Sequence, residues 1–157
     1  MSDPMTADPL RPVLALFAAV SAAHHAAQRL LEARLPDGFG PSQFAVLDRL
    51  ARLGEGQTPI AIADAFGWPK TSMSHTVAVL EARGLVRLEP NPRDGRSKCL
   101  WLTPKGRTLA ARGRAAVETD LARLGALADA AEVELLAADL LSLAARLSDQ
   151  RRFPDAA

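Results

Sequence analysis

The sequence has a single cysteine, Cys99, among its 157 residues. One thiol cannot form a disulfide within the chain, and it cannot provide a cysteine cluster for a metal ion. The sequence also lacks an uninterrupted apolar run long enough to cross a bilayer. Its first residues, MSDPMTADPLRP, have acids and prolines where a signal peptide has a basic start and an apolar core. We therefore expect a cytoplasmic protein that forms no internal disulfide and has no membrane partner.

Motifs of catalysis and cofactor binding are also missing. The sequence contains no glycine-rich phosphate loop, no nucleophile elbow, no histidine and cysteine set at metal-ligand spacing and no persuasive pair of acids. His24 and His25 are neighbours, so on a helix they point about 100° apart and cannot readily bind the same ion. These absences predict a protein that is not an enzyme and has no metal ion or cofactor.

The charged residues are unevenly distributed in a composition that is otherwise ordinary for one globular domain, with 48% hydrophobic residues. Residues 70–114 contain ten basic and three acidic side chains, a net charge of +7, whereas the whole chain has a net charge of +1. A basic segment in a nearly neutral protein is typical of a lobe that binds a polyanion. The alternative interpretation is a solvated basic face without a binding role.

Apolar spacing and helix-cap residues predict six helices and one β-hairpin. The predicted helices span residues 8–34, 42–53, 58–66, 68–84, 104–126 and 129–148. Between the fourth and fifth helices the apolar period changes from helical to alternating. Residues 85–89 and 98–103 therefore predict two strands, joined by a long basic tip with the sequence PNPRDGRS.

This order of elements predicts a mostly α protein, in which a winged helix-turn-helix is framed by long terminal helices. We expect an N-terminal dimerisation helix over residues 8–36, a winged helix-turn-helix DNA-binding domain over 41–103, and C-terminal dimerisation helices over 104–150. Long helices of this apolar content need a partner that covers them, so the expected assembly is a two-fold homodimer. The alternative is a monomer whose two ends fold onto its own lobe.

The helix predicted over WPKTSMSHTVAVLEARG has two different faces. Met73, Val77 and Leu80 form a stripe that we expect to be buried. The opposite face is small and polar, which allows a close approach to base edges in a major groove, and the free amides of the first turn favour phosphate. The predicted DNA-contacting residues of this helix are Lys70, Thr71, Ser72, Ser74 and His75.

The tip of the predicted hairpin adds Arg93, Arg96 and Lys98 to the candidates for DNA contact. Two arginines on a narrow turn-rich loop suit a minor groove, where the negative potential is deepest. Asp94 has two interpretations, as a partner that orients an arginine or as an Asx-type turn residue beside Gly95. The alternative for the whole loop is a solvated hairpin.

Cys99 lies on the second predicted strand, where it alternates with Leu100 and Leu102. Because successive side chains of a strand point to opposite faces, we expect Cys99 and Trp101 to face away from the inner side. This placement favours a structural or incidental cysteine over one that senses oxidants.

The core of this chain, at about residues 41–114, resembles the winged-helix core of the MarR family of transcriptional regulators. The likeness is carried by LEARGLV at the helix-to-strand junction, RDGR in the wing and LTPKGR at the start of the next helix. The resemblance implies a homodimer, expected to be a repressor, that binds a pseudo-palindromic operator in double-stranded DNA. It implies Arg96 in the minor groove, with Asp94 bracing that arginine.

The same resemblance implies a small lipophilic or aromatic effector, bound between the dimer helices and the DNA-binding lobe. The residues predicted to line such a site are Phe17, His24, His25 and Phe44.

A winged helix that contacts another protein, and not DNA, is the alternative function. In that case the charge of residues 70–114 would be coincidental, and binding would lack the steep salt dependence of a DNA complex.

Overall fold

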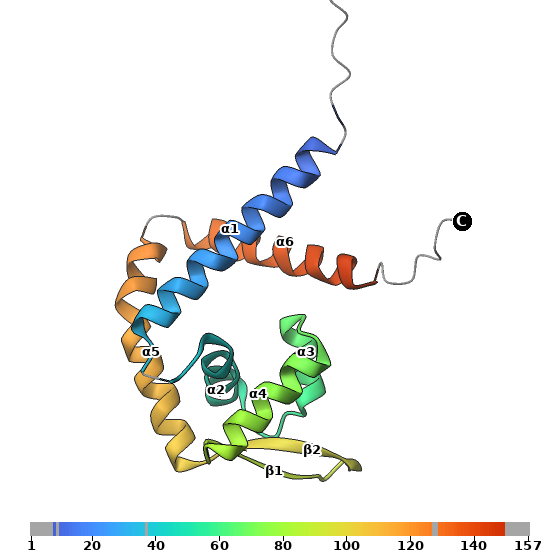
Figure 1. Cartoon of the computed structure of the whole chain (residues 1–157), viewed down its shortest axis with the longest axis vertical. Helices are drawn as coiled ribbons and strands as arrows, with labels where there is room; N and C mark the ends of the chain where they lie inside the picture. The colour runs from blue at the N-terminus through green and yellow to red at the C-terminus, as the bar shows by residue number, and fades with distance from the viewer. Residues whose placement is uncertain (1–7, 9, 37, 127–128, 150–157) are drawn as a thin grey trace, which may run out of the picture.

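A computed structural model describes residues 8, 10–36, 38–126 and 129–149 of the chain. Over these residues the chain forms helices and one two-stranded antiparallel sheet (Figure 1). The elements are α1 (Arg11–Arg34), α2 (Pro41–Leu53), α3 (Pro59–Phe66), α4 (Lys70–Ala82), β1 (Val86–Asn91), β2 (Asp94–Leu102), α5 (Pro104–Gly125) and α6 (Ala130–Asp149). The prediction of a mostly α winged helix-turn-helix between long terminal helices is confirmed.

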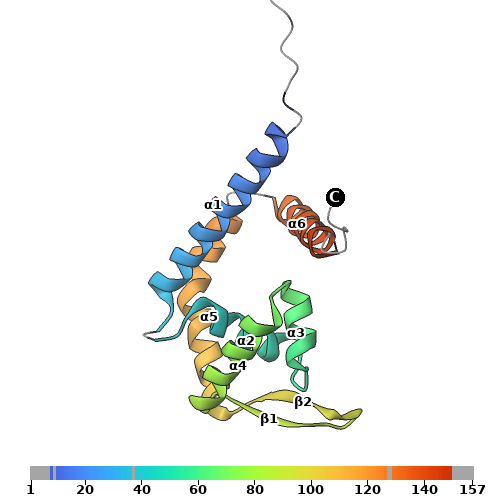
Figure 2. The same ribbon diagram turned by 45° about the vertical axis from the view of Figure 1, so that its right-hand side comes forward.

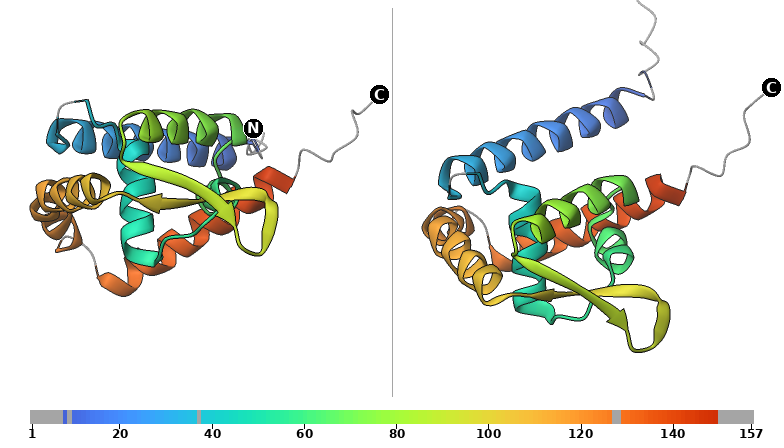
Figure 3. Two further views of the ribbon diagram at one scale, coloured as in Figure 1. Left: turned by 90° about the horizontal axis from the view of Figure 1, so that it is seen from below. Right: turned by 60° about the horizontal axis from the view of Figure 1, so that its bottom comes forward.

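Helices α2, α3 and α4 form one lobe with the β1–β2 hairpin, which we call the wing (Figures 1 and 2). Helix α5 packs against α2 along one side of this lobe, and α1 and α6 lie at the end remote from the wing. Seen from the wing side, the tip of the hairpin projects beyond the helices (Figure 3). The lobe therefore presents α4 and the wing on a side that the terminal helices do not cover.

The hydrophobic core lies inside this lobe, where the three short helices meet the inner face of the hairpin. The predicted stripe of α4 is buried, since Met73, Val77 and Leu80 are 1%, 5% and 0% exposed. Two predicted helix caps also form: Thr58 Oγ1 accepts a hydrogen bond from Ala61 N–H at 3.2 Å, and Thr103 caps α5 in the same way.

The first helix starts later than predicted. The described helix α1 begins at Arg11 and not at residue 8, with Pro12 in its first turn. Asp8 Oδ1 accepts a hydrogen bond from Leu10 N–H at 3.0 Å, and Asp8 O accepts one from Arg11 N–H. Asp8 thus forms a turn before the helix and does not cap it.

The tip of the wing is much shorter than the predicted loop, because the strands continue through most of it. Strand β1 extends to Asn91 and β2 starts at Asp94, so only residues 92–93 form the turn. Asn91 Nδ2 donates to Ser97 Oγ at 2.9 Å, and Ser97 Oγ donates to the Asp94 carbonyl at 3.1 Å. These polar side chains, which resemble loop residues in a sequence, stabilise the strand ends here.

Cys99 is only 2% exposed, although it alternates with Leu100 on β2. The alternation does put Cys99 and Trp101 on the outer face of the hairpin, but that face is covered. The Trp101 ring packs against Gly56 of the α2–α3 loop, and the Arg87 guanidinium lies 5.8 Å from the ring centroid. Cys99 therefore points to the outer face of the hairpin and is nevertheless buried.

Candidate nucleic-acid interface

One face of helix α4 is polar and exposed to solvent. The side chains of Lys70, Thr71, Ser72, Ser74 and His75 are all exposed. The helix starts directly after Pro69, with no side-chain hydrogen bond to its first turn. The amide groups of this turn are therefore free to bind an anion, and the positive end of the helix dipole favours one.

Within α4, the hydroxyl of Ser74 has a defined orientation. Ser74 Oγ donates a hydrogen bond to the Lys70 carbonyl at 2.9 Å. The hydroxyl proton is then engaged by the helix itself, and the oxygen remains available as an acceptor. In this rotamer, Ser74 is suited to accept from an amino group of a base.

Three basic side chains of the wing, those of Arg93, Arg96 and Lys98, are exposed at or near its tip. Asp94 Oδ1 accepts a hydrogen bond from the backbone N–H of Arg96 at 3.1 Å. Of the two interpretations of Asp94, this contact corresponds to the Asx-type turn. Asp94 therefore fixes the backbone that carries Arg96, and the guanidinium has no acidic partner among the described residues.

Three of the ten basic side chains of residues 70–114 form ion pairs within the described part of the chain. Arg87 pairs with Glu89, Arg107 pairs with Glu55, and Arg114 pairs with Asp48 at 3.1 Å. In contrast, the basic residues predicted to contact DNA form no ion pair within the described part of the chain; these are Lys70, Arg93, Arg96 and Lys98. Their charges are thus available to neutralise phosphates.

A groove of about 420 Å³ joins α4 to the wing. Ser74 from α4 and Arg96 and Lys98 from β2 line it together. Ile60, Val77 and Leu88 supply apolar walls. The structure thus brings together residues that lie more than twenty positions apart in the sequence, and we call this feature the α4–wing groove.

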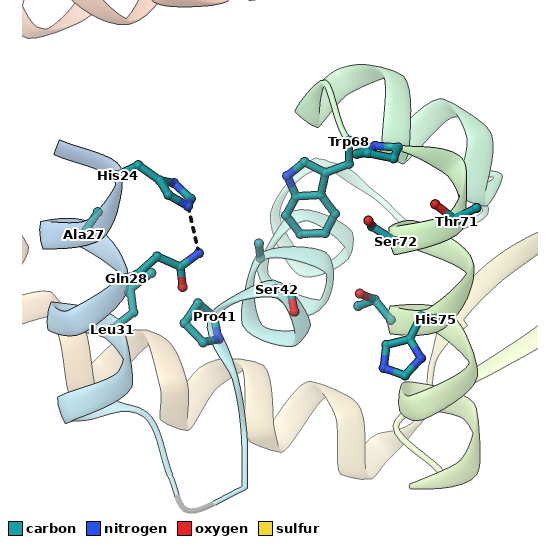
Figure 4. A pocket seen from close by; sticks show the side chains of 13 residues that line it. His24, Ala27, Gln28, Leu31, Pro41, Ser42, Trp68, Thr71, Ser72 and His75 are labelled. Carbon is teal, nitrogen blue, oxygen red and sulfur yellow. Dashed lines mark hydrogen bonds between the residues drawn. The ribbon is translucent and has the colours of Figure 1, made fainter. Parts of the chain in front are cut away.

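On its other flank, α4 borders a second and larger cavity, of about 810 Å³, which it shares with α1 and α2 (Figure 4). We call it the α1–α4 cavity. His24 and Gln28 point into it from α1, with their Nε2 atoms 3.5 Å apart. Its lining residues are His24, Ala27, Gln28, Leu31, Pro41, Ser42, Ala45, Trp68, Pro69, Thr71, Ser72, His75 and Thr76.

Of the residues predicted to line an effector site, only His24 lines this cavity. Phe17 and His25 are exposed on α1 outside it. Phe44 packs edge-on against Phe39, with ring centroids 6.1 Å apart, and contacts the backbone position of Gly113. Phe44 thus packs between α2 and α5 and does not line the cavity.

Other residues that line the α1–α4 cavity are not among those predicted from the sequence. Trp68, which lies between α3 and α4, forms part of the wall, and Thr76 is only 6% exposed although it is polar. No local pattern could have identified these residues, because the cavity exists only where three elements meet.

Neither a metal cluster nor a membrane span occurs in the described ranges. No three His, Cys, Asp or Glu side chains there are placed to hold an ion. None of the described helices combines the length and apolar character needed to cross a membrane.

Part of the sequence is similar to one known family. Residues 37–97 match the sequence model of the MarR family. The transcriptional regulator HosA of Escherichia coli O111:H- is 36% identical over 77 residues, which cover 49% of this chain and 56% of that protein. The chain thus aligns with little more than half the length of this relative.

Solved structures have the same fold over nearly the whole chain. A MarR family regulator from Neisseria meningitidis superposes with a TM-score of 0.72 at 22% identity, covering 91% of this chain and 96% of that one. A mutant MarR from E. coli, in complex with operator DNA, gives a TM-score of 0.69 at 23% identity and covers 87% and 99%. At these identities the likeness establishes a common fold.

Proposed function

We propose that this chain, whose residues 37–97 match the sequence model of the MarR family, is a transcriptional regulator of that family that binds double-stranded DNA in a sequence-specific manner. One observation carries the proposal: Arg96 and Lys98 of the wing, which have no ion-pair partner among the described residues, line one groove with Ser74 from the open polar face of α4. A structural relative of the same fold is bound to operator DNA, which supports the same function here.

In this proposal α4 enters the major groove and the wing reaches the adjacent minor groove. Lys70, Thr71 and Ser72 contact phosphate at the start of α4, while Ser74 and His75 contact base edges. Arg96 inserts into the minor groove, and Arg93 and Lys98 neutralise phosphates beside it. Residues 41–103 are then the DNA-binding domain.

We also propose that the regulator acts as a homodimer, with residues 8–36 and 104–150 as its dimerisation parts. The support is an apolar surface that a single chain leaves exposed on its terminal helices. The exposed apolar residues there are Leu10, Val13, Leu14, Leu16, Phe17, Val20, Leu121, Leu124, Val133, Leu135, Leu136, Leu140, Leu141 and Leu147. A surface of this kind marks an interface, and a two-fold dimer would read a pseudo-palindromic operator.

The α1–α4 cavity is the proposed site of a small lipophilic or aromatic effector. It connects a dimerisation helix to the DNA-reading helix, and Thr71, Ser72 and His75 belong both to its wall and to the candidate DNA surface. A ligand bound there would favour one arrangement of α4 relative to α1, and so would change the distance between the two reading helices of a dimer. Release from the operator on binding would make the protein a repressor.

Selection of bound sequences from a random pool of double-stranded DNA tests the function. We expect an enriched pseudo-palindrome with half-sites about one helical turn apart, and an affinity that falls steeply with salt. A pool without enrichment, together with binding that hardly depends on salt, would favour the alternative of a protein-contacting winged helix. Sedimentation at micromolar concentration tests the dimer, because a species of only 16.7 kDa would contradict it.

A further inference from the structure

The wing joins the rest of the protein at residues 84–86 and 102–107, which we call the wing root. On the β1 side of the wing root, hydrogen bonds connect the wing to the start of α5. Thr103 Oγ1 donates a hydrogen bond to the Gly84 carbonyl at 2.7 Å, and Thr103 N–H donates to Leu85 O at 3.1 Å. Gly106 lies so close to this strand that a Cβ on it would be 2.0 Å from Leu85 O. The LTPKGR motif thus fastens the start of β1 to the start of α5.

The β2 side of the wing root is held by the loop between α2 and α3. Leu100 receives a hydrogen bond from Gly56 N–H and donates one to Gln57 O, both at 2.9 Å. The next amide on the same edge of β2 belongs to Leu102, and its acceptor is a side chain and not a backbone carbonyl. Leu102 N–H donates to Glu55 Oε2 at 2.9 Å. The carboxylate therefore extends the ladder along the free edge of β2 by one hydrogen bond.

The same carboxylate reaches α5. Glu55 also accepts hydrogen bonds from the guanidinium of Arg107, and its side chain is 19% exposed. One carboxylate thus connects the α2–α3 loop, the end of β2 and the first turns of α5. Charge-assisted hydrogen bonds of this kind are stronger than neutral ones and set a geometry.

We propose that Glu55 and Arg107 are positioning residues for DNA recognition, which fix the wing against α5 so that Arg96 is presented at a defined place. The inference rests on the proposed DNA-binding function. A two-stranded hairpin is marginally stable by itself, so its direction depends on how its root is held. Arg96 is six residues from Leu102 along β2, which is roughly 20 Å in a strand, so a rotation of about 5° at the root would displace Arg96 by roughly 2 Å.

A positioning role for Glu55 and simple electrostatics predict opposite changes in DNA affinity when Glu55 is replaced. Glu55 is an acid in a protein that binds a polyanion, so removing its charge should strengthen DNA binding if charge alone matters. A positioning role requires the reverse, because Leu102 N–H loses its acceptor and Arg107 loses its partner. The sign of the change in affinity therefore separates the two effects.

The experiment measures binding of the selected operator by fluorescence anisotropy at one salt concentration. Glu55→Ala should weaken binding about five- to tenfold, near the lower end of the effect of deleting an arginine that contacts DNA. Glu55→Gln retains an acceptor for Leu102 N–H but loses the ion pair, so its affinity should lie between those of Glu55→Ala and the wild type. Asp48→Ala is the matched control: Asp48 has a side chain 21% exposed and pairs with Arg114 of α5, away from the wing. This control should bind as well as the wild type or more tightly.

A double-mutant cycle with Arg96→Ala tests whether Glu55 acts through the wing. In the Arg96→Ala background, Glu55→Ala should weaken binding less than about twofold, since the side chain that it positions is gone. Thermal melts identify any variant that fails to fold. If Glu55→Ala fails to fold, the affinity of Glu55→Gln, which preserves the shape of the side chain, is used to test the proposal.

Two outcomes would overturn the inference alone: operator binding by Glu55→Ala and Glu55→Gln as tight as that of the wild type or tighter, or a loss that persists in full without Arg96. Failure of the wild-type chain to bind any DNA would instead overturn the proposed function, and the inference with it.

Discussion

Replacing Gly106 with alanine is expected to destabilise the protein at the wing root. Gly106 lies in the first turn of α5, and a Cβ built on it would be 2.0 Å from the carbonyl oxygen of Leu85 and 3.0 Å from the carbonyl carbon. These atoms belong to the backbone, so no side chain can rotate away from the new methyl group. Alanine fits only if α5 and the start of β1 move apart.

The size of the effect follows from the contacts that this movement would disturb. Leu85 O accepts hydrogen bonds from Thr103 N–H at 3.1 Å and from Thr103 Oγ1 at 3.2 Å. Overpacking costs about 1–3 kcal/mol and a lost hydrogen bond about 1 kcal/mol, while the better helix propensity of alanine returns at most about 1 kcal/mol. We therefore expect the free energy of unfolding to fall by about 2 kcal/mol, which lowers Tm by about 4–8 °C in a chain of this size.

Thermal unfolding followed by circular dichroism measures this change. All variants are compared at one protein concentration, because the Tm of a dimer depends on concentration. Gly125→Ala, at the other end of the same helix, is the control: its Cβ would have no atom within 4 Å, so it should melt at the wild-type temperature or slightly above. A Gly106→Ala variant with the wild-type Tm would refute the close approach of α5 to β1.

Three further predictions concern the proposed DNA surface and one helix cap. Arg96→Ala should weaken operator binding by about 1–3 kcal/mol with an unchanged thermal melt. Asp94→Ala should weaken it less, since it removes only the turn that supports Arg96. If both variants bound the operator as tightly as the wild type, the wing would not be part of the complex. His75→Ala should change which bases are enriched in a repeated selection, whereas an equal loss on all sequences would reassign His75 to a phosphate. Thr58→Ala removes the hydrogen bond from Ala61 N–H and should lower the free energy of unfolding by about 1 kcal/mol, which an unaltered thermal melt would contradict.

The helices of the DNA-binding lobe could be predicted because their ends depend on neighbouring residues. Thr58 and Thr103 each precede a proline, and each side chain accepts a hydrogen bond from the third residue after it. Gly84 follows α4 with φ +65°, a conformation that L side chains disfavour. Caps and glycines of this kind act over one helical turn, so they can be recognised from the sequence alone.

The wing root and the α1–α4 cavity could not be predicted in this way. Glu55 and the amide that it accepts from, Leu102 N–H, are 47 positions apart, and Glu55 reads in the sequence as an ordinary loop acid. His24 and His75 come from different helices that meet only in the folded chain. Periodicity indicates which face of an element is buried, but it does not say which other element covers that face.

The distribution of charge illustrates the same limit. The sequence predicts a basic segment, and all its arginines look equivalent. In the structure, Arg107 and Arg114 are engaged by Glu55 and Asp48, whereas Arg96 has no ion-pair partner within the described ranges. Bases that hold α5 against the lobe are thereby separated from bases that are free to contact a polyanion, and only long-range geometry makes that distinction.

The short side chains of α4 link the proposed recognition of DNA to its proposed regulation. Thr71, Ser72 and His75 are exposed and also line the α1–α4 cavity. A hydroxyl side chain ends one atom beyond Cβ, so it allows a helix to approach base edges closely and leaves the space towards α1 unfilled. A lysine or glutamate at Ser72 would extend into that space and hold the helix away from the bases. The composition that suits α4 to a groove therefore also leaves the cavity beside it open, and a ligand in that cavity would contact side chains of the proposed DNA-contacting surface.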